Sequence, residues 1–482
     1  MQLDLLSNSN YKIFKDVIHD SIDVSLVANA IIDTKIFQRL RNLHQLGVSY
    51  MVFPNANNNR FEHSIGTYYV TGMLLNNLIT NSDSKEINSS MLLIPFIKNY
   101  LLKNFEFIES EENIKFLTNI QTVLLDDYII ELIKIAGLVH DLGHGPFSHL
   151  FDEWLHHSPD ISKSNELIEH ENRSIILLGK IIQSTNINFN NEIYKLSEFI
   201  DEDAYNFISE LINPNESSPT NFIFQIISNT LNGLDVDKLD YLYRDSFYLG
   251  AGIPFDLKRI VTHARVINNN ICFPEKVSYD IYKVFRSRYD LHKQYYNHKT
   301  IVCVEYMVRN ILYQLDKILN ISQIINNKNL DKFVDLTDSM IFDTTKILKN
   351  FNSVYKQFKE PIDYIEDQIA RLECRKIYKC LYSGSFNTDE TNIDQHIEQQ
   401  IKTLLENPNE ILEKIYSNNF DKNKIFPIKI KIGLLSGNKS HPFDNLYFYN
   451  RNGFSNVLPK EKISHLMSPL HQEVILYILY LD

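Results

Sequence analysis

Apolar residues recur every three or four positions along much of the first three quarters of the chain. In residues 28–46, for example, Ile31, Leu40 and Leu43 share this spacing. Such spacing places side chains on one face of an α-helix, so it predicts a helix over residues 28–46. The same pattern predicts further helices over residues 67–79, 126–140 and 221–245, and a long helix or a broken pair of helices over 280–315.

The pattern changes near the C-terminus. Ile428, Ile430 and Ile432 alternate with lysines, which predicts a β-strand over residues 425–435. A second short strand is expected over residues 445–449, whereas the polar residues 81–90 are expected to form a loop.

These patterns predict a mainly α fold in which a large helical lobe precedes a smaller, mixed α/β lobe. We expect a loose N-terminal tail over residues 1–10, the helical lobe over 11–378 and the C-terminal lobe over 379–482. The composition agrees, because only 14 glycines and 14 prolines occur among 482 residues. A chain with so few turn-forming residues has room for few short strands.

Charge and hydropathy exclude some classes of protein. The chain carries 48 basic and 60 acidic residues, a formal net charge of −12, so a nucleic-acid partner is possible but not favoured. Residues 1–12 lack the cationic start and apolar run of a secretory signal. Apolar runs stay far below the roughly 20 residues of a membrane span. We therefore expect a soluble intracellular protein with no membrane partner, in either the cytoplasm or the nucleus.

The segment from Gly137 to Asp152 contains an unusual concentration of metal-binding side chains. It reads GLVHDLGHGPFSHLFD, and an adjacent His140–Asp141 pair follows an apolar helix. An imidazole and a carboxylate can turn toward one ion if the chain bends at this point. His63 and Asp237 lie in two other motifs. Together the four residues offer two imidazoles and two carboxylates, which suits a divalent transition metal with open positions.

Three blocks carry a resemblance to a known family: residues 60–64 (RFEHS), 135–149 (IAGLVHDLGHGPFSH) and 232–241 (NGLDVDKLDY). They resemble the HD-domain deoxynucleoside triphosphate (dNTP) triphosphohydrolases, and among these the antiviral enzymes that join a sterile-alpha-motif domain to the HD domain. The resemblance covers about residues 14–299, and the short segment before it leaves no room for a sterile-alpha-motif domain. Residues 11–378 are then expected to be the HD catalytic lobe.

The resemblance implies an enzyme that converts a dNTP and water to a deoxynucleoside and inorganic triphosphate. It implies that His63, His140, Asp141 and Asp237 bind Fe, Mn, Zn, Ni or Co, while Mg accompanies the triphosphate. His149 is expected to act beside the metal with Asp152 orienting its ring, and His144 to contact phosphate. His170 matches the family's general acid for the 5′ oxygen.

The resemblance also implies substrate contacts. The triphosphate contacts would be Arg60, Lys238, Tyr241 and Arg288. Gln45 and Asp245 would hold the 3′ hydroxyl. Tyr296 would pack under the sugar and exclude a 2′ hydroxyl, with Leu46 beside it. Asn297, near the base, is one methylene shorter than the glutamine of the close relative, and His292 belongs to the same segment.

Regulation by nucleotides is a further implication. The family's enzymes form a tetramer when nucleotides bind between subunits, so we expect GTP or dGTP and a dNTP as effectors of a homo-oligomer, from dimer to tetramer. Asp33, Gln38 and Arg41 match the guanine-reading site. Arg259 and Lys299 match contacts to a second effector.

Two other functions remain open at this point. One is an HD-type phosphodiesterase or nucleotidase that acts on another phosphate ester. The other is a non-catalytic nucleic-acid-binding scaffold, which the negative charge and the intact set of metal ligands disfavour.

Overall fold

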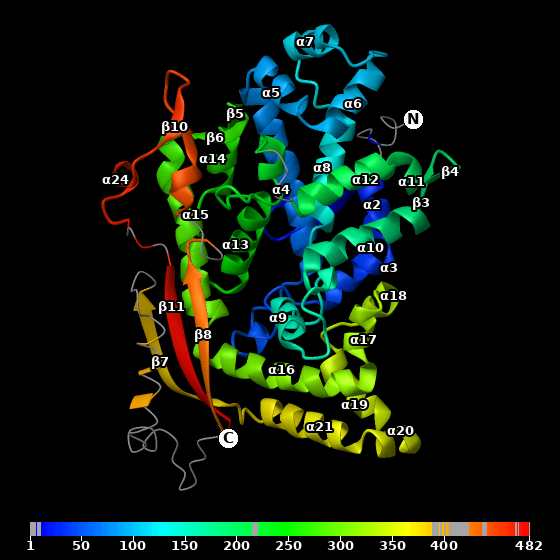
Figure 1. Cartoon of the computed structure of the whole chain (residues 1–482), viewed down its shortest axis with the longest axis vertical. Helices are drawn as coiled ribbons and strands as arrows, with labels where there is room; N and C mark the ends of the chain where they lie inside the picture. Colours follow the sequence, from blue (N-terminus) through cyan, green and yellow to red (C-terminus); the bar gives the residue numbers. More distant parts are fainter. Residues whose placement is uncertain are drawn as a thin grey trace.

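Helix α4 (Arg60–Asn81) lies at the centre of the fold, against α8 (Asp127–Val139) and α13 (Val236–Tyr248) (Figure 1). The computed structural model describes residues 11–214, 220–387, 424–435, 441–467 and 472–481, together with residues 6, 395, 398, 399, 402, 403 and 470. Helices make up most of this part of the chain, which confirms the mainly α fold.

The remaining helices follow in chain order. Those before α13 are α2 (Leu26–Ile32), α3 (Lys35–Gln38), η2 (Arg39–Asn42), η3 (Ser49–Met51), α5 (Ser84–Met91), α6 (Pro95–Asn104), α7 (Glu111–Asn119), α9 (His149–His157), η4 (Glu166–Ile168), α10 (His170–Ser184), α11 (Leu196–Phe199), α12 (Glu202–Ile212) and η5 (Phe222–Gln225). Those after it are α14 (Leu257–Thr262), η6 (Glu275–Val277), α15 (Ser278–Leu291), η7 (His292–Tyr296), α16 (Lys299–Leu319), α17 (Ile321–Asn326), α18 (Leu330–Phe333), α19 (Met340–Leu348), α20 (Asn352–Gln357), α21 (Lys359–Glu373), η9 (Pro442–Asn445) and α24 (Lys460–Ile463).

The strands form small sheets at the edges of the helical body (Figure 1). Two are antiparallel hairpins, β1 (Lys12–Asp16) with β2 (Asp20–Val24) and β3 (Asn186–Phe189) with β4 (Glu192–Lys195). A three-stranded sheet places β11 (Gln472–Tyr480) between β7 (Lys379–Asn387) and β8 (Ile425–Gly433), both antiparallel to it. A four-stranded sheet has the order β10 (Ser455–Val457), β9 (Tyr447–Tyr449), β6 (Asn270–Pro274), β5 (Arg265–Ile267).

The C-terminal region is joined to the helical body through this last sheet. Strand β9 pairs in parallel with β6, although about 175 residues separate them in sequence. One cluster of buried apolar side chains extends from the N-terminal hairpin to β11. The predicted domain boundary at residue 378 stays a prediction. The predicted tail over residues 1–10 lies outside the described residues, apart from the buried Leu6.

Several predicted elements are confirmed. The apolar runs at 67–79 and 126–140 lie in α4 and α8. The 280–315 segment is a broken pair, α15 and α16, joined by the π-helical turn η7. The predicted strands correspond to β8 and β9.

The single helix predicted over residues 28–46 is wrong. Helix α2 ends at Ile32, and the side chain of Thr34 then accepts a hydrogen bond from the Phe37 amide to begin α3. A short 3₁₀ turn, η2, follows. Asp33 and Thr34 favour caps over helix interiors, because their side chains compete for backbone hydrogen bonds.

Two other predictions need correction. Residues 81–90 are not a loop, because Asp83 caps α5 and the helix buries Ile87 and Met91. Residues 221–245 are not one helix: the short 3₁₀ turn η5 and a non-helical segment precede α13. Gly233 in that segment has a φ of +71°, which favours glycine and ends helical geometry.

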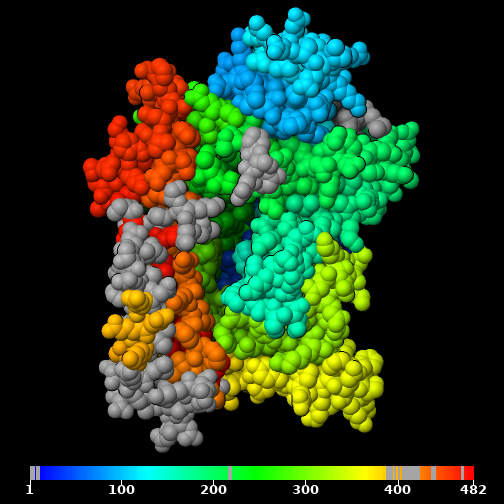
Figure 2. All heavy atoms as spheres, in the orientation of Figure 1, coloured from blue at the N-terminus to red at the C-terminus, as the bar shows by residue number. Residues whose placement is uncertain are grey.

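The helical body contains a cavity of about 610 Å³. Its walls come from the segment before α4, the α8–α9 connection, α10, α13 and the α15–α16 junction. Figure 2 shows this face of the molecule hollowed beside α9. The volume is typical of small-molecule sites. Across the described helices, no stretch combines the length and apolarity needed to cross a membrane.

Candidate active site and metal centre

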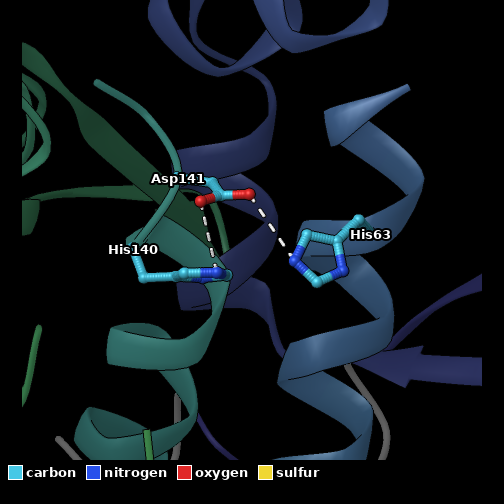
Figure 3. Close-up of side chains that lie close together, drawn as sticks. All are labelled: His63, His140 and Asp141. Atoms are coloured by element: carbon cyan, nitrogen blue, oxygen red, sulfur yellow. Dashed lines mark ion pairs between the residues drawn. The ribbon is translucent and has the colours of Figure 1, made fainter. Parts of the chain in front are cut away.

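Three helix ends bring the predicted metal ligands together. Asn59 and Glu62 form a capping box that starts α4 and places His63 in its first turn. His140 caps the C-terminal end of α8, with Asp141 next to it. Asp237 lies in the first turn of α13. Figure 3 shows the Asp141 carboxylate between the two imidazole rings.

The four ligand side chains converge on one point. The Asp237 Oδ1 lies 3.0 Å from His63 Nε2 and 3.4 Å from His140 Nε2. The Asp141 Oδ1 lies 3.3 Å from His140 Nε2, and its Oδ2 lies 3.5 Å from His63 Nε2. Ligands about 2.1 Å from a shared ion are separated by roughly 3.0–3.4 Å, so the spacing fits a metal.

Hydrogen bonds on the far side of each ring set its tautomer. His140 Nδ1 donates to the Gly137 carbonyl at 2.8 Å, and His63 Nδ1 donates to Asp240 Oδ2 at 2.8 Å. Each Nε2 therefore keeps a lone pair for a metal. The Nε2 of His140 is buried without a hydrogen-bond partner in the described part of the chain, as expected for a metal ligand. The chemistry of this donor set fits a divalent ion without identifying it.

A second cluster of histidines lies beside the first. The His144 and His170 rings are stacked with centroids 3.8 Å apart, and the His149 ring lies 5.0 Å from His144. Helix α9 begins at His149, whose side chain is 78% exposed, while Asp152 one turn later is buried. His149 therefore faces the cavity, beside the candidate metal ligands.

Asp152 is not placed as predicted. Its Oδ2 lies 3.3 Å from His170 Nδ1 but 4.0 Å from His149 Nδ1, so it orients His170 rather than His149. Its other oxygen accepts a hydrogen bond from Arg173. The physical reason is that α10 supplies both Arg173 and His170, which approach Asp152 from the protein interior.

The surroundings of His170 and His144 shift the pKa values of these two rings in opposite directions. Burial lowers the pKa of His170, but the hydrogen bond and charge of Asp152 outweigh it, so the pKa lies above its usual value. Burial and the nearby Arg60 and His170 charges hold the pKa of His144 well below its usual value. His170 is thus the better proton donor, and His144 the neutral neighbour.

Cations line the same cavity. Arg60 Nε donates to Ser148 Oγ at 2.8 Å, and Nη1 donates to Asp141. Its Nη2 is buried with no hydrogen-bond partner among the described residues. Lys238 and Arg288 lie on the cavity wall, and Arg288 Nη1 also donates to the Gly433 carbonyl at 2.5 Å. The wall can accept a strongly anionic ligand.

The opposite part of the cavity is built around Asp245. It accepts hydrogen bonds from Tyr296 Oη at 2.6 Å and Asn58 Nδ2 at 2.7 Å, and burial raises its pKa to about 6. Tyr296 lies in η7, and such π turns occur frequently at functional sites. Asn297 donates to the His292 carbonyl at 3.0 Å.

Most predicted catalytic, metal and substrate residues line the cavity. Those that do are Gln45, Leu46, Arg60, His140, Asp141, His144, His149, His170, Asp237, Lys238, Tyr241, Asp245, Arg288, His292, Tyr296 and Asn297. His63 and Asp152 are not in the lining and lie behind it.

The predicted effector residues lie elsewhere. Arg41 Nε donates to Gln38 Oε1 at 2.8 Å, and Gln38 Nε2 donates to the carbonyl next to Asp33 at 2.8 Å. These three residues share one surface near α2 and η2. Arg259 forms an ion pair with Asp280 at 3.1 Å, and Lys299 is exposed at the start of α16. None of the five lines the cavity.

Sequence reasoning missed two arginines that hold the loop between α8 and α9. Arg39 donates to the His144 carbonyl at 2.7 Å, and Arg173 donates to the Gly143 carbonyl at 2.6 Å. Both are buried. In the sequence, each arginine is recognisable only as a charged residue at a position where the helical pattern calls for an apolar residue facing the core.

Asp240 and Glu305 were also missed. Asp240 follows Asp237 by one turn and holds His63. Glu305 lies on the cavity wall, where burial and the nearby Glu153 charge raise its pKa to about 8. Asp240 lies within the 232–241 block, but its position in the sequence does not show that it contacts His63, and Glu305 belongs to none of the three blocks. Only the tertiary structure identifies what these two carboxylates touch.

Comparisons with known proteins give the following relatives. The chain is 36% identical to an HD domain-containing protein of Acanthamoeba polyphaga mimivirus over 470 residues, which cover 97% of this chain and 92% of that protein. It is 32% identical to the deoxynucleoside triphosphate triphosphohydrolase SAMHD1 homolog of Dictyostelium discoideum over 477 residues, 98% of this chain and 77% of that protein. Identity to human SAMHD1 is 31% over 378 residues, 72% of this chain and 53% of that protein. No protein-family model matches the chain.

Proposed function

Because the chain belongs to the HD-domain family of SAMHD1-like deoxynucleoside triphosphate triphosphohydrolases, we propose that it hydrolyses dNTPs to deoxynucleosides and inorganic triphosphate. The observation that carries this proposal is the His63–His140–Asp141–Asp237 cluster, three of whose members line a cavity that also presents His170 and several cations. The Dictyostelium and human relatives are named for this reaction.

The proposed reaction breaks the bond between the α-phosphorus and the 5′ oxygen. A divalent ion on the four ligands would acidify water and neutralise phosphate charge. Arg60 Nη2, Lys238 and Arg288 would bind the triphosphate, for which an accompanying Mg is expected. His170 would donate its proton to the departing 5′ oxygen, because Asp152 raises the pKa of the ring and so favours its protonated form.

The part of the cavity around Asp245 would bind the sugar of the substrate. The ionised carboxylate and Gln45 would hold the 3′ hydroxyl. Tyr296 is fixed by its hydrogen bond to Asp245, so its ring would pack under the sugar where a 2′ hydroxyl would clash. Leu46, His292 and Asn297 complete this end of the cavity near the base.

Product analysis tests the reaction. Purified protein would be incubated with dGTP alone, and with dATP with and without GTP, in Mg, Mn, Fe or Co. Ion-exchange chromatography should reveal deoxynucleoside and triphosphate in equal amounts. Release of phosphate or diphosphate would favour another HD phosphohydrolase. Salt-dependent binding of single-stranded nucleic acid without any metal-dependent hydrolysis would favour the scaffold function.

Replacing Tyr296 with alanine should weaken the discrimination between deoxyribo- and ribonucleotides. Removing the ring opens space for a 2′ hydroxyl, so the dATP-to-ATP ratio of kcat/KM should fall by roughly tenfold or more. The Tyr296→Phe variant keeps the ring and should keep the discrimination. An unchanged ratio in the alanine variant would show that another group excludes the 2′ hydroxyl.

We also propose activation by GTP or dGTP, with a dNTP at a second effector site. The grouping of Asp33, Gln38 and Arg41 supports this, because a carboxylate, an amide and a guanidinium suit the edge of guanine. Arg259 and Lys299 remain the proposed second-site contacts. Light scattering should detect a change from dimer toward tetramer when GTP is added. An activity assay should show that dATP turnover depends on GTP. A constant mass and GTP-independent turnover would contradict this regulation.

A further inference from the structure

The turn of the N-terminal β1–β2 hairpin reaches the carboxylate that holds a metal ligand. His19 Nε2 lies 2.6 Å from Asp240 Oδ1, and Asp240 Oδ2 accepts the 2.8 Å hydrogen bond from His63 Nδ1. The His19, Asp240 and His63 side chains are 4%, 0% and 0% exposed. One carboxylate thus joins a hairpin near the N-terminus to the ring of a proposed metal ligand.

Arg244 makes this connection rigid. Its Nε and Nη2 donate to the two oxygens of Asp240 at 2.9 and 3.0 Å, and its Nη1 donates to Asp16 Oδ2 at 2.8 Å. The other Asp16 oxygen accepts hydrogen bonds from the Ile18 and His19 amides, both at 2.8 Å. The hairpin turn and the Asp240 carboxylate are therefore held by one buried guanidinium.

Helix α4 is shaped to admit this network. A Cβ atom on Gly66 would lie 2.1 Å from Asp240 Oδ1 and 2.4 Å from Arg244 Nη2. Those distances are too short for any side chain, so glycine is needed one turn after His63. The Tyr69 ring, 5.0 Å from the His19 ring, packs beside it.

The network has a direct physical consequence for His63. A carboxylate that accepts from Nδ1 leaves the Nε2 lone pair on the metal side, fixes the ring orientation and makes the imidazole a stronger ligand. Asp240 can do this only while its own oxygens are held in place. His19 supplies one of those restraints, from an element that carries no metal ligand.

We propose that His19 is a positioning residue for His63, and that docking of the β1–β2 hairpin thereby sets the affinity of the centre for its divalent ion. This inference rests on the metal centre of the proposed function. The same hairpin carries Lys12, whose Nζ lies 3.5 Å from Asp33 Oδ1, so it also touches the proposed guanine-reading surface. Movement of the hairpin would be transmitted to His63.

The test is titration of the metal-free full-length chain with Mn²⁺ by isothermal calorimetry. His19→Ala should bind Mn²⁺ roughly 10- to 100-fold more weakly than the wild type. His19→Gln should restore most of the affinity, because its Nε2 amide can still donate to Asp240 Oδ1. Asp23→Asn, an exposed change on the same hairpin, should bind as the wild type does. Thermal unfolding of the metal-free proteins shows whether each variant is folded.

The possible results are distinguishable. A folded His19→Ala variant with wild-type affinity would overturn the proposal, as would equal weakening by alanine and glutamine. If His19→Ala does not fold, Asp240→Asn serves instead, since its amide is a poorer acceptor for Nδ1–H; wild-type affinity there would overturn the proposal. Failure of the wild type to bind Mn²⁺ or any other divalent ion would contradict the metal centre itself.

Discussion

The Asp141→Asn variant is expected to lose turnover by on the order of a thousandfold or more. Asp141 is proposed to bind the metal, and it also accepts a hydrogen bond from Arg60, so the change weakens both the centre and the phosphate-binding wall. Removing a ligand charge forfeits several kcal/mol of transition-state stabilisation. The measurement is the initial rate of deoxyguanosine release from dGTP, together with metal content by mass spectrometry.

A matched control separates this effect from a general loss of stability. Asp203→Asn changes an exposed carboxylate on α12 and should leave the rate unchanged. Chelation should inactivate the wild type, and added Mn²⁺ or Co²⁺ should restore it, whereas Asp141→Asn should stay inactive. Substantial turnover in a metal-free Asp141→Asn variant would show that catalysis does not depend on this centre.

The His170→Asn variant is expected to lose about 10²- to 10⁴-fold in kcat, the usual contribution of a general acid. His170 lines the cavity, and Asp152 raises the pKa of its ring, which favours the protonated, proton-donating form. KM and Mn²⁺ affinity should change little, because His170 is not one of the four proposed metal ligands. Steady-state kinetics with dGTP give both parameters.

The pH profile gives a second readout for His170. A proton donor is lost as pH rises through its pKa, so wild-type kcat should fall on the alkaline side. The His170→Asn variant should not show this fall in kcat at alkaline pH. His157→Asn, an exposed change at the end of α9, should behave as the wild type does. Equal kcat in His170→Asn and wild type would assign the proton donor elsewhere.

The sequence predicted the candidate site better than the connections between helices. His140 and Asp141 are adjacent in the chain, and the blocks around His63 and Asp237 are long enough to be recognised. The π turn at His292–Tyr296 and the breaks near Asp33 and Gly233 depend on single caps and turns. Periodicity reports which face of a segment is buried, and it is insensitive to where one helix stops and the next begins.

The role of Asp152 illustrates what spacing along the chain cannot settle. Asp152 lies three positions after His149, which places both near one face of α9, and the family resemblance implied that they interact. The structure directs His149 toward the cavity, while Arg173 and His170 of α10 hold Asp152. The choice between two histidines depends on the packing of a second helix.

The sequence by itself predicted the mainly α fold from local periodicity and a candidate metal-ligand set from residue types in short motifs. Through the resemblance to a known family it also predicted most of the residues that line the cavity. The tertiary structure alone decided how distant segments support that site. Arg39 and Arg173 hold the loop between α8 and α9, β9 pairs with β6, and His19 reaches Asp240 across 221 positions of sequence. Such contacts join segments far apart in the chain, so no local pattern specifies them.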